Sequence, residues 1–230
     1  MLSKKILSAS QTSGGGGEPS GDIAFIGVNN GDESGSSPGT SPLVSFGSSA
    51  ISVQSGDLLL VFISDDVTQT LSNLSSGWTE AYKSTGHRGS STVAAYYKTV
   101  SSSDTSFSID GSDSSGAASS VMMAFRNASF ASAAASTSDK DDPPSVSTSS
   151  GDAVVISLHY QDDNSRASPS DSDLPTSAGD AFRYVSSSTS SGMLTWYNLS
   201  PSNPYNVGDI RSGDDPSGDL GAGTILLNNS

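Results

Sequence analysis

Apolar residues along this chain fall into short runs of strand length, separated by Gly, Ser, Asn and Asp. Residues 58–63 are continuously apolar, which is typical of a strand covered on both faces. In residues 153–158 apolar side chains alternate, with Val154, Ile156 and Leu158 on one face. After residue 21 no segment keeps a helical period over three turns, so the pattern predicts an all-β protein.

Two further strands show the same two-residue period. One places Val93, Ala95 and Tyr97 on one face and Tyr96 and Lys98 on the other. The other lines one side with alternate apolar residues over 121–125, and residues 225–227 make a similar closing run near the end of the chain. The spacing of these strands and their turn signals favours an antiparallel two-sheet β-sandwich of jelly-roll or immunoglobulin-like type.

The element order occurs twice, which predicts an internal duplication. A shift of about one hundred positions aligns two stretches without a gap. The aligned pairs are Leu74 with Leu174, Glu80 with Asp180, Ala81 with Ala181, Tyr82 with Phe182, Lys83 with Arg183, Val93 with Met193, Tyr96 with Trp196 and Tyr97 with Tyr197. Upstream, after a small change of register, Ser55-Gly56-Asp57 matches Ser150-Gly151-Asp152. Each Gly-Asp pair precedes an apolar run, where a turn must lead the chain into a buried strand.

The duplication divides the chain into three parts. Residues 1–21 form an N-terminal docking arm and a Gly-rich linker, residues 22–140 a first β-sandwich repeat, and residues 141–230 a second. Two tandem sandwiches compete with one larger pseudo-symmetric sandwich, and we expect a single body because each half alone is short of core. The alanine-rich stretch 131–135 precedes Asp142-Pro143-Pro144 and is interpreted as the connection between the repeats.

Composition and charge narrow the function classes. Roughly a quarter of the chain is serine and 33% is hydrophobic, but the clustering of the apolar residues favours an ordered protein over a disordered one. The net charge of −14, with ten scattered basic residues, argues against a nucleic-acid partner. The absence of cysteine excludes a disulfide scaffold and a thiolate metal site. No apolar run approaches the roughly 20 residues of a membrane helix, and the segment after Lys4-Lys5 is too short for a signal peptide.

Candidate catalytic motifs are weak. Residues 35–39 match the G-x-S-x-G pattern of serine hydrolases, but Thr40-Ser41-Pro42 follows where that chemistry needs a helix. We therefore assign Ser37 to a loop and name no catalytic residue. The two histidines, His87 and His159, occupy different contexts and are too few for a His-based zinc site.

Acidic loops raise the question of calcium, which prefers oxygen ligands. The candidate clusters are Asp139, Asp141 and Asp142, then Asp162 and Asp163, then Asp214, Asp215 and Asp219. None has the spacing of a calcium loop with a distal Glu, and acidic loops are usually solvated. We therefore predict no metal and no cofactor, and the sequence leaves calcium binding at an Asp cluster open.

Aromatic residues offer a further alternative, a sugar-stacking platform. The candidates are Trp78, Tyr82, Tyr96, Tyr97, Phe182, Trp196 and Tyr197. Their alternation within strands favours core packing for most of them. Since Tyr96 and Trp196 lie on the opposite face from Tyr97 and Tyr197, one of these two pairs is a candidate for exposure.

Four segments occur in an order that resembles the β-sandwich structural proteins of bacteriophage virions, particularly marine phages, and some bacterial surface proteins. They are Gly56-Asp57-Leu58-Leu59-Leu60-Val61, Ser76-Gly77-Trp78-Thr79, Ala95-Tyr96-Tyr97-Lys98 and Ala124-Phe125-Arg126-Asn127. The first seven residues with the glycine linker also resemble the start of many phage head- and tail-associated proteins. In the second copy Ala178-Gly179-Asp180 replaces the Gly-Trp-Thr segment, and the Phe-Arg ending is absent.

The resemblance implies a non-enzymatic virion accessory protein on the particle surface, as capsid decoration, head fibre or tail appendage. Its partners would be other virion proteins (capsid, portal or tail components), with a possible homo-oligomer. Residues Leu2, Lys4, Lys5, Ile6 and Leu7 form an apolar and basic patch on a tether, and we expect it to dock into an acidic partner surface. The alternative is a glycan-binding module or adhesin that contacts host surface polysaccharide through exposed aromatics.

Overall fold

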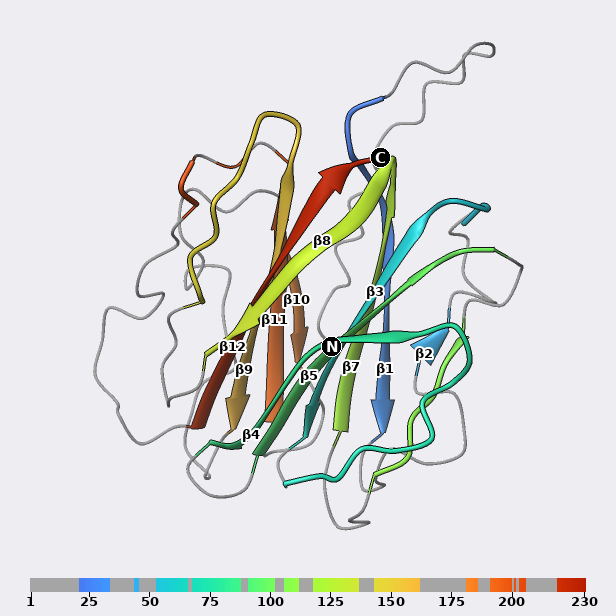
Figure 1. The fold of residues 1–230 in the computed structure, drawn as a ribbon. Helices are drawn as coiled ribbons and strands as arrows, with labels where there is room; N and C mark the ends of the chain where they lie inside the picture. Colours follow the sequence, from blue (N-terminus) through green and yellow to red (C-terminus); the bar gives the residue numbers. More distant parts are fainter. Residues whose placement is uncertain are drawn as a thin grey trace, which may run out of the picture.

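The continuously apolar run forms the central strand of a five-stranded antiparallel sheet, here called sheet 1 (Figure 1). In spatial order the strands of sheet 1 are β1 (Ala24–Glu33), β7 (Ala118–Arg126), β3 (Leu58–Asp65), β5 (Ser91–Thr99) and β4 (Thr79–His87). Every residue of β3 is buried, as predicted for a strand covered on both faces.

The second half of the chain forms sheet 2, which is also antiparallel and five-stranded. Its strands, in spatial order, are β8 (Ala128–Ala135), β12 (Asp219–Asn229), β9 (Ala153–Gln161), β11 (Ser191–Asn198) and β10 (Ala181–Val185). A two-stranded sheet pairs β2 (Val44–Ser45) with β6 (Ser106–Phe107). The computed structural model describes residues 21–33, 44–45, 53–65, 68–87, 91–101, 106–111, 118–136, 143–161, 181–185, 191–199, 201, 203–205 and 219–230.

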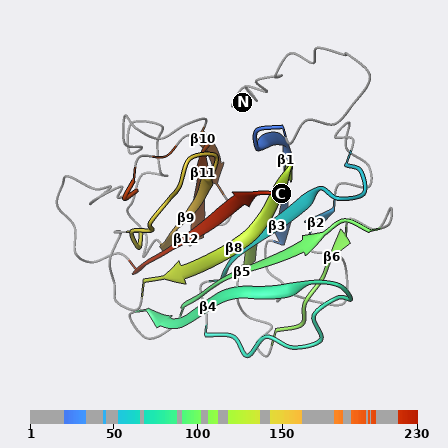
Figure 2. The same ribbon diagram turned by 45° about the horizontal axis from the view of Figure 1, so that its top comes forward.

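Sheets 1 and 2 pack face to face, so the described residues form an all-β sandwich without helix, as the sequence predicts (Figures 1 and 2). The shared core draws on both sheets, with Leu60, Phe62 and Met123 from sheet 1 and Val155 and Ile225 from sheet 2. Burying apolar surface contributes about 25 cal/mol per Å² to the free energy of folding, so the apolar layer between the two sheets is the main stabilising feature of the fold.

The duplication is visible in the strand order. Sheet 1, read from β1, has the order β1-β7-β3-β5-β4, and sheet 2, read from β8, has the order β8-β12-β9-β11-β10. When the strands of each copy are numbered along the chain, the two orders are the same. The registers agree as well: Leu60 pairs with Tyr97 and Met123 in sheet 1, and Val155 pairs with Tyr197 and Ile225 in sheet 2. The two copies therefore share one topology, and each copy supplies one sheet of the sandwich.

Aromatic contacts between the sheets follow the same pseudo-symmetry. Phe25 on the edge strand β1 stacks on Tyr197 with ring centroids 4.4 Å apart. Phe130 on the edge strand β8 stacks on Tyr97 with ring centroids 4.0 Å apart. A β-bulge lies next to each phenylalanine, between Phe25 and Gly27 in β1 and opposite Leu226 and Leu227 in the β8–β12 pair. The bulges bend both edge strands at equivalent points.

A single residue, Asn127, carries the chain from sheet 1 to sheet 2. Its φ of 55° lies in the left-handed region, which Asn tolerates better than most residues. The Asn127 side-chain amide donates to the backbone carbonyl oxygen of Asp22 at 3.3 Å. The backbone carbonyl oxygen of Asn127 accepts from the backbone amide of Ser230 at 3.1 Å. The change of sheet thus falls inside the segment that the sequence assigns to the first repeat, residues 22–140.

The interpretation of residues 131–135 as a connection is wrong, because they belong to strand β8. The stretch lacks large apolar residues, and the pattern gave no strand signal for that reason. Pairing with β12 supplies its backbone hydrogen bonds, and Phe130 provides the large core contact. Small side chains suffice in the rest of this edge strand.

A second apolar cluster covers the outer face of sheet 1. Val61, Tyr96 and Met122 lie beneath Trp78 and Phe107, which come from loop 68–78 and from β6. The indole N–H of Trp78 donates to the carbonyl oxygen of Ser106 at 2.9 Å, and the Trp78 and Phe107 rings meet edge to face. This cover explains why β3 is apolar on both faces.

Candidate functional site

The predicted docking residues, Leu2, Lys4, Lys5, Ile6 and Leu7, lie outside the residues that the structure describes. The described chain begins at Gly21 and Asp22, which lead into β1. The two Gly-Asp turns, at Asp57 and at Asp152, differ in the side chains that contact the aspartate. We take the end of the sandwich that holds these turns and Asp22 as the candidate site.

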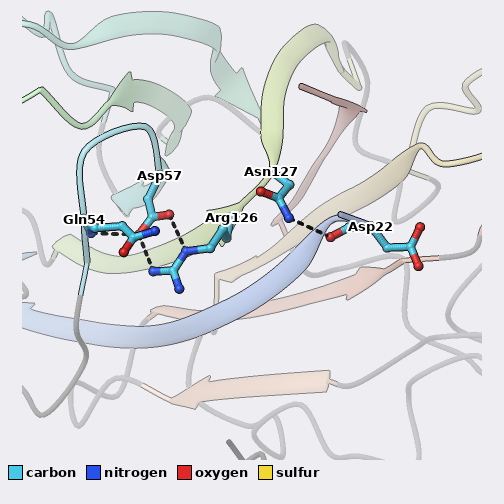
Figure 3. Close-up of polar contacts among 5 residues, drawn as sticks. All are labelled: Asp22, Gln54, Asp57, Arg126 and Asn127. Carbon is cyan, nitrogen blue, oxygen red and sulfur yellow. Dashed lines mark hydrogen bonds and ion pairs between the residues drawn. The ribbon is translucent and has the colours of Figure 1, made fainter. Parts of the chain in front are cut away.

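The turn of the first copy is closed by a buried carboxylate. Gly56 has a φ of 93°, a conformation that glycine adopts at little cost. The Asp57 carboxylate, 1% exposed, accepts a hydrogen bond from the backbone amide of Gln54 at 2.8 Å. The same carboxylate also accepts two hydrogen bonds from the Arg126 guanidinium, from Nε at 2.9 Å and from Nη2 at 3.0 Å (Figure 3). Arg126 thereby ties the end of β7 to the start of β3.

This geometry favours the charged form of Arg126. The hydrogen bond to Asp57 is the largest cause that raises the pKa of Arg126 above its already high ordinary value. A group whose pKa rises on folding contributes stability that is fully present below its unfolded pKa. For arginine that value already lies far above neutrality, so the guanidinium stays protonated at any ordinary pH.

The turn of the second copy has the same backbone and a different environment. Gly151 has a φ of 90°, and the Asp152 carboxylate accepts from the amide of Ser149 at 2.6 Å. Leu58 pairs with Phe125 in sheet 1, and Ala153 pairs with Leu227 in sheet 2. The residue that corresponds to Arg126 is therefore Asn228, which has no charge to offer Asp152.

A groove with a volume of about 510 Å³ opens beside this second turn. Asp152 and the preceding residues 149–151 form one wall, and Asp22 and Ile23 from the start of β1 form another. Leu199 and Pro201, which follow β11, complete it. Two carboxylates and three apolar residues line the groove, and none of its described lining residues is basic. In Figure 3 the Asp22 side chain points away from the Asp57–Arg126 pair.

A separate polar contact joins the sheets inside the core. Tyr82, on the edge strand β4, extends across to sheet 2, where its hydroxyl lies 2.5 Å from the Ser157 hydroxyl. Gly223 of β12 leaves the space that the ring occupies, because a Cβ at this position would overlap the Tyr82 ring. The contact has no equivalent in the other copy, where Phe182 and Phe62 take the places of Tyr82 and Ser157.

Burial raises the pKa of Tyr82 well above its ordinary value, and the Ser157 hydrogen bond partly opposes this. Burial also raises the pKa of Tyr96, and the nearby Glu80 carboxylate adds to the effect. Because the pKa is higher in the folded than in the unfolded chain, the neutral tyrosine stabilises the folded state. This contribution to the free energy of unfolding is complete below the unfolded pKa of about 10 and is lost as pH rises toward the folded pKa.

We expect the free energy of unfolding to fall above pH 10 by up to about 1.4 kcal/mol per pH unit for each of these tyrosines. Urea unfolding between pH 8 and pH 11 measures this slope. Tyr82→Phe should lose its share of the slope while Tyr96 retains its own. An unchanged slope in Tyr82→Phe would show that Tyr82 ionises equally well in the folded chain.

The aromatic platform suggested by the sequence is largely core. Trp78, Tyr82, Tyr96 and Tyr197 are all buried, and Tyr97 is half-buried against Phe130. The preference for core packing is therefore confirmed for these residues. The side chains of Phe182 and Trp196 lie outside the described part of the chain.

The remaining sequence candidates fall mostly on residues that are not described. Ser37 and the acidic clusters at 139–142, 162–163 and 214–215 lie outside the described ranges, as do the side chains of His87, His159 and Asp219. Within the described ranges no group of three or more His, Asp or Glu side chains is arranged to hold a metal ion. No helix among these residues is long and apolar enough to cross a membrane.

Comparisons with protein-family models, with curated proteins and with solved structures found no match to this chain.

Proposed function

We propose that this chain is a non-enzymatic structural protein of a phage virion, displayed on the particle surface and anchored by its N-terminal arm. The proposal rests on the ordered resemblance of four sequence segments to virion β-sandwich proteins. Capsid decoration, head fibre and tail appendage are the roles that it covers, and capsid, portal or tail proteins are the partners.

The observation that carries the proposal is that all four segments belong to the structural framework of the sandwich. Gly56 and Asp57 form the first turn, and Trp78 covers the outer face of sheet 1. Tyr96 and Tyr97 pack on opposite faces of β5, and Arg126 closes the Asp57 turn. A resemblance confined to folding elements supports a scaffold more than a shared chemistry.

The polar side chains that the fold buries also support a structural role. Asp57 is neutralised by Arg126, and the Lys98 ammonium donates to the carbonyl oxygen of Ser76 beside the Trp78 ring. Tyr82 joins Ser157 across the core. Each of these groups ties one element of the sandwich to another. The net charge of −14 suits a protein that stays soluble while it is displayed on a surface.

Anchoring by the arm is tested with a deletion of residues 1–17 in the producing phage. We expect the truncated protein to fold with nearly unchanged thermal stability, because these residues precede the first strand, and to be lost from purified particles. Mass spectrometry of the particles measures the occupancy, and circular dichroism checks the fold. The matched control is the full chain with Ser3→Ala.

Two outcomes would contradict the proposal at different points. If the full-length protein is absent from purified particles, the virion role is wrong. If the truncated protein reaches wild-type occupancy, the virion role stands and attachment must run through the sandwich. The glycan-binding alternative predicts binding of the full-length protein to host polysaccharide. It has less support, because the described aromatics are core residues.

A further inference from the structure

We propose that in the free protein the groove beside Asp152 holds the chain's own residues 2–7, with Lys4 or Lys5 placed against the Asp152 carboxylate. This goes beyond the proposed function, because it concerns the arm before any particle is met. The groove is formed by the Asp22–Ile23 lead, the second Gly-Asp turn, and Leu199 with Pro201.

The duplication supplies the first argument. Asp57 and Asp152 occupy equivalent turns, and both accept a hydrogen bond from the amide three residues earlier. Asp57 is completed by a guanidinium from its own sheet. In the second copy Asn228 stands at the position of that arginine, so the Asp152 carboxylate has no corresponding cation among the described residues. A positively charged group from outside sheet 2 would restore the pairing that the first copy has internally.

Charge and apolar complementarity indicate the occupant. The groove presents two carboxylates, Asp22 and Asp152, next to the partly exposed apolar side chains of Leu199 and Pro201, with the buried Ile23 beneath. Residues 2–7 read Leu-Ser-Lys-Lys-Ile-Leu, and Lys4-Lys5 is the one place in the sequence where two Lys or Arg residues are adjacent. A segment with two ammonium groups between apolar residues matches both kinds of lining, and the groove would also cover Leu2, Ile6 or Leu7 from water.

Chain length permits the return and favours the chain's own arm. Asp22 is itself part of the groove, and the residues between Lys5 and Asp22 include the run Gly14 to Gly17. The scaling for Gly- and Ser-rich sequences gives a linker of this length an average end-to-end distance of about 20 Å. Such a tether keeps the arm at an effective concentration in the millimolar range, which a second copy in dilute solution does not reach.

Zero-length carbodiimide cross-linking of the full-length protein tests the inference, because it joins a lysine amine to a carboxylate only where the two are in contact. An equal mixture of ¹⁴N- and ¹⁵N-labelled copies separates links within a chain from links between chains. We expect Lys4 or Lys5 to be joined to Asp152 within one chain. Asp57, which carries the same turn but already pairs with Arg126, should give no such link and is the internal control.

Two sets of variants provide an independent readout. Asp152→Asn keeps an oxygen that can accept from the Ser149 amide, and it should leave the fold intact while arm links to the second turn disappear. In NMR spectra of the full chain, Lys4→Ala/Lys5→Ala should shift the amide signals of Gly151 and Asp152. Ser3→Ala should leave these signals unchanged.

The remaining outcomes overturn the inference. Links to Asp152 that occur only between differently labelled copies would assign the groove to the arm of a second copy. The absence of links, together with unshifted Gly151 and Asp152 signals in the double lysine variant, would leave the groove without the arm. Neither result bears on whether the protein is found in particles, so the proposed function is tested separately.

Discussion

Replacing Gly223 with alanine is expected to destabilise the sandwich by about 3 kcal/mol, at the upper end of the usual cost of overpacking a core. The added methyl group would overlap the hydroxyl end of the Tyr82 ring, which lies against Gly223. To make room, Tyr82 must leave its slot, and it then loses both the burial of its ring and the contact with Ser157. Urea unfolding at pH 7 measures the effect.

A double-mutant cycle with Tyr82→Ala separates this mechanism from a general cost of alanine in β12. Tyr82→Ala alone should cost about 3 to 4 kcal/mol, because it leaves a cavity in the core. In that background Gly223→Ala should be nearly neutral, since the atoms it would overlap are gone, and the two changes should be strongly non-additive. Equal costs of Gly223→Ala in both backgrounds would place the strain elsewhere.

The shared strand order of the two copies was predictable because the duplication preserved the patterns that the fold depends on. The aligned pairs of Tyr97 with Tyr197 and of Lys83 with Arg183 correspond to equivalent places in the two registers. The Gly-Asp turns were also recognisable, since Gly56 and Gly151 adopt the positive φ that such a turn needs. These features are local or periodic, and a single sequence carries them.

Other features depended on contacts that no local pattern records. Strand β8 is made of small residues and is held by β12 and by one stacked ring, so its sequence has no strand period. The switch of sheets at Asn127 looked like an ordinary position, because one left-handed residue suffices for it. Each copy therefore supplies a sheet of one sandwich, which the sequence alone left open.

The candidate groove lies between these cases. Its residues Asp22, Leu199 and Pro201 are far apart in sequence and carry no motif, so the groove could not be predicted. One signal was present: the first copy ends in Phe125-Arg126, and the second copy lacks this ending. Together with the strand register, that difference identifies Asp152 as the carboxylate that has Asn228 where the first copy has an arginine. Comparing the two copies of a duplicated fold is informative, because one copy serves as the reference for the other.

The same comparison gives the second large effect, which is expected at Arg126. Arg126→Ala leaves the Asp57 carboxylate, 1% exposed, with the Gln54 backbone amide as its remaining donor among the residues that the structure describes. Breaking a buried ion pair by removing one partner costs about 3 to 5 kcal/mol, and we expect about 3 kcal/mol because Arg126 itself is 34% exposed. Urea unfolding at pH 7 measures the loss.

A matched pair of variants tests whether the charge is the cause. Asp57→Asn keeps an oxygen for the Gln54 amide but leaves the Arg126 guanidinium without its carboxylate, so it should cost about 2 kcal/mol. Asp152→Asn makes the same change in the equivalent turn, where Asn228 takes the place of the arginine, and should cost less than about 1 kcal/mol. Because the two turns share a backbone, the difference between these costs isolates the ion pair. Equal costs would mean that both aspartates stabilise the fold only by accepting the amide hydrogen bond within their own turns.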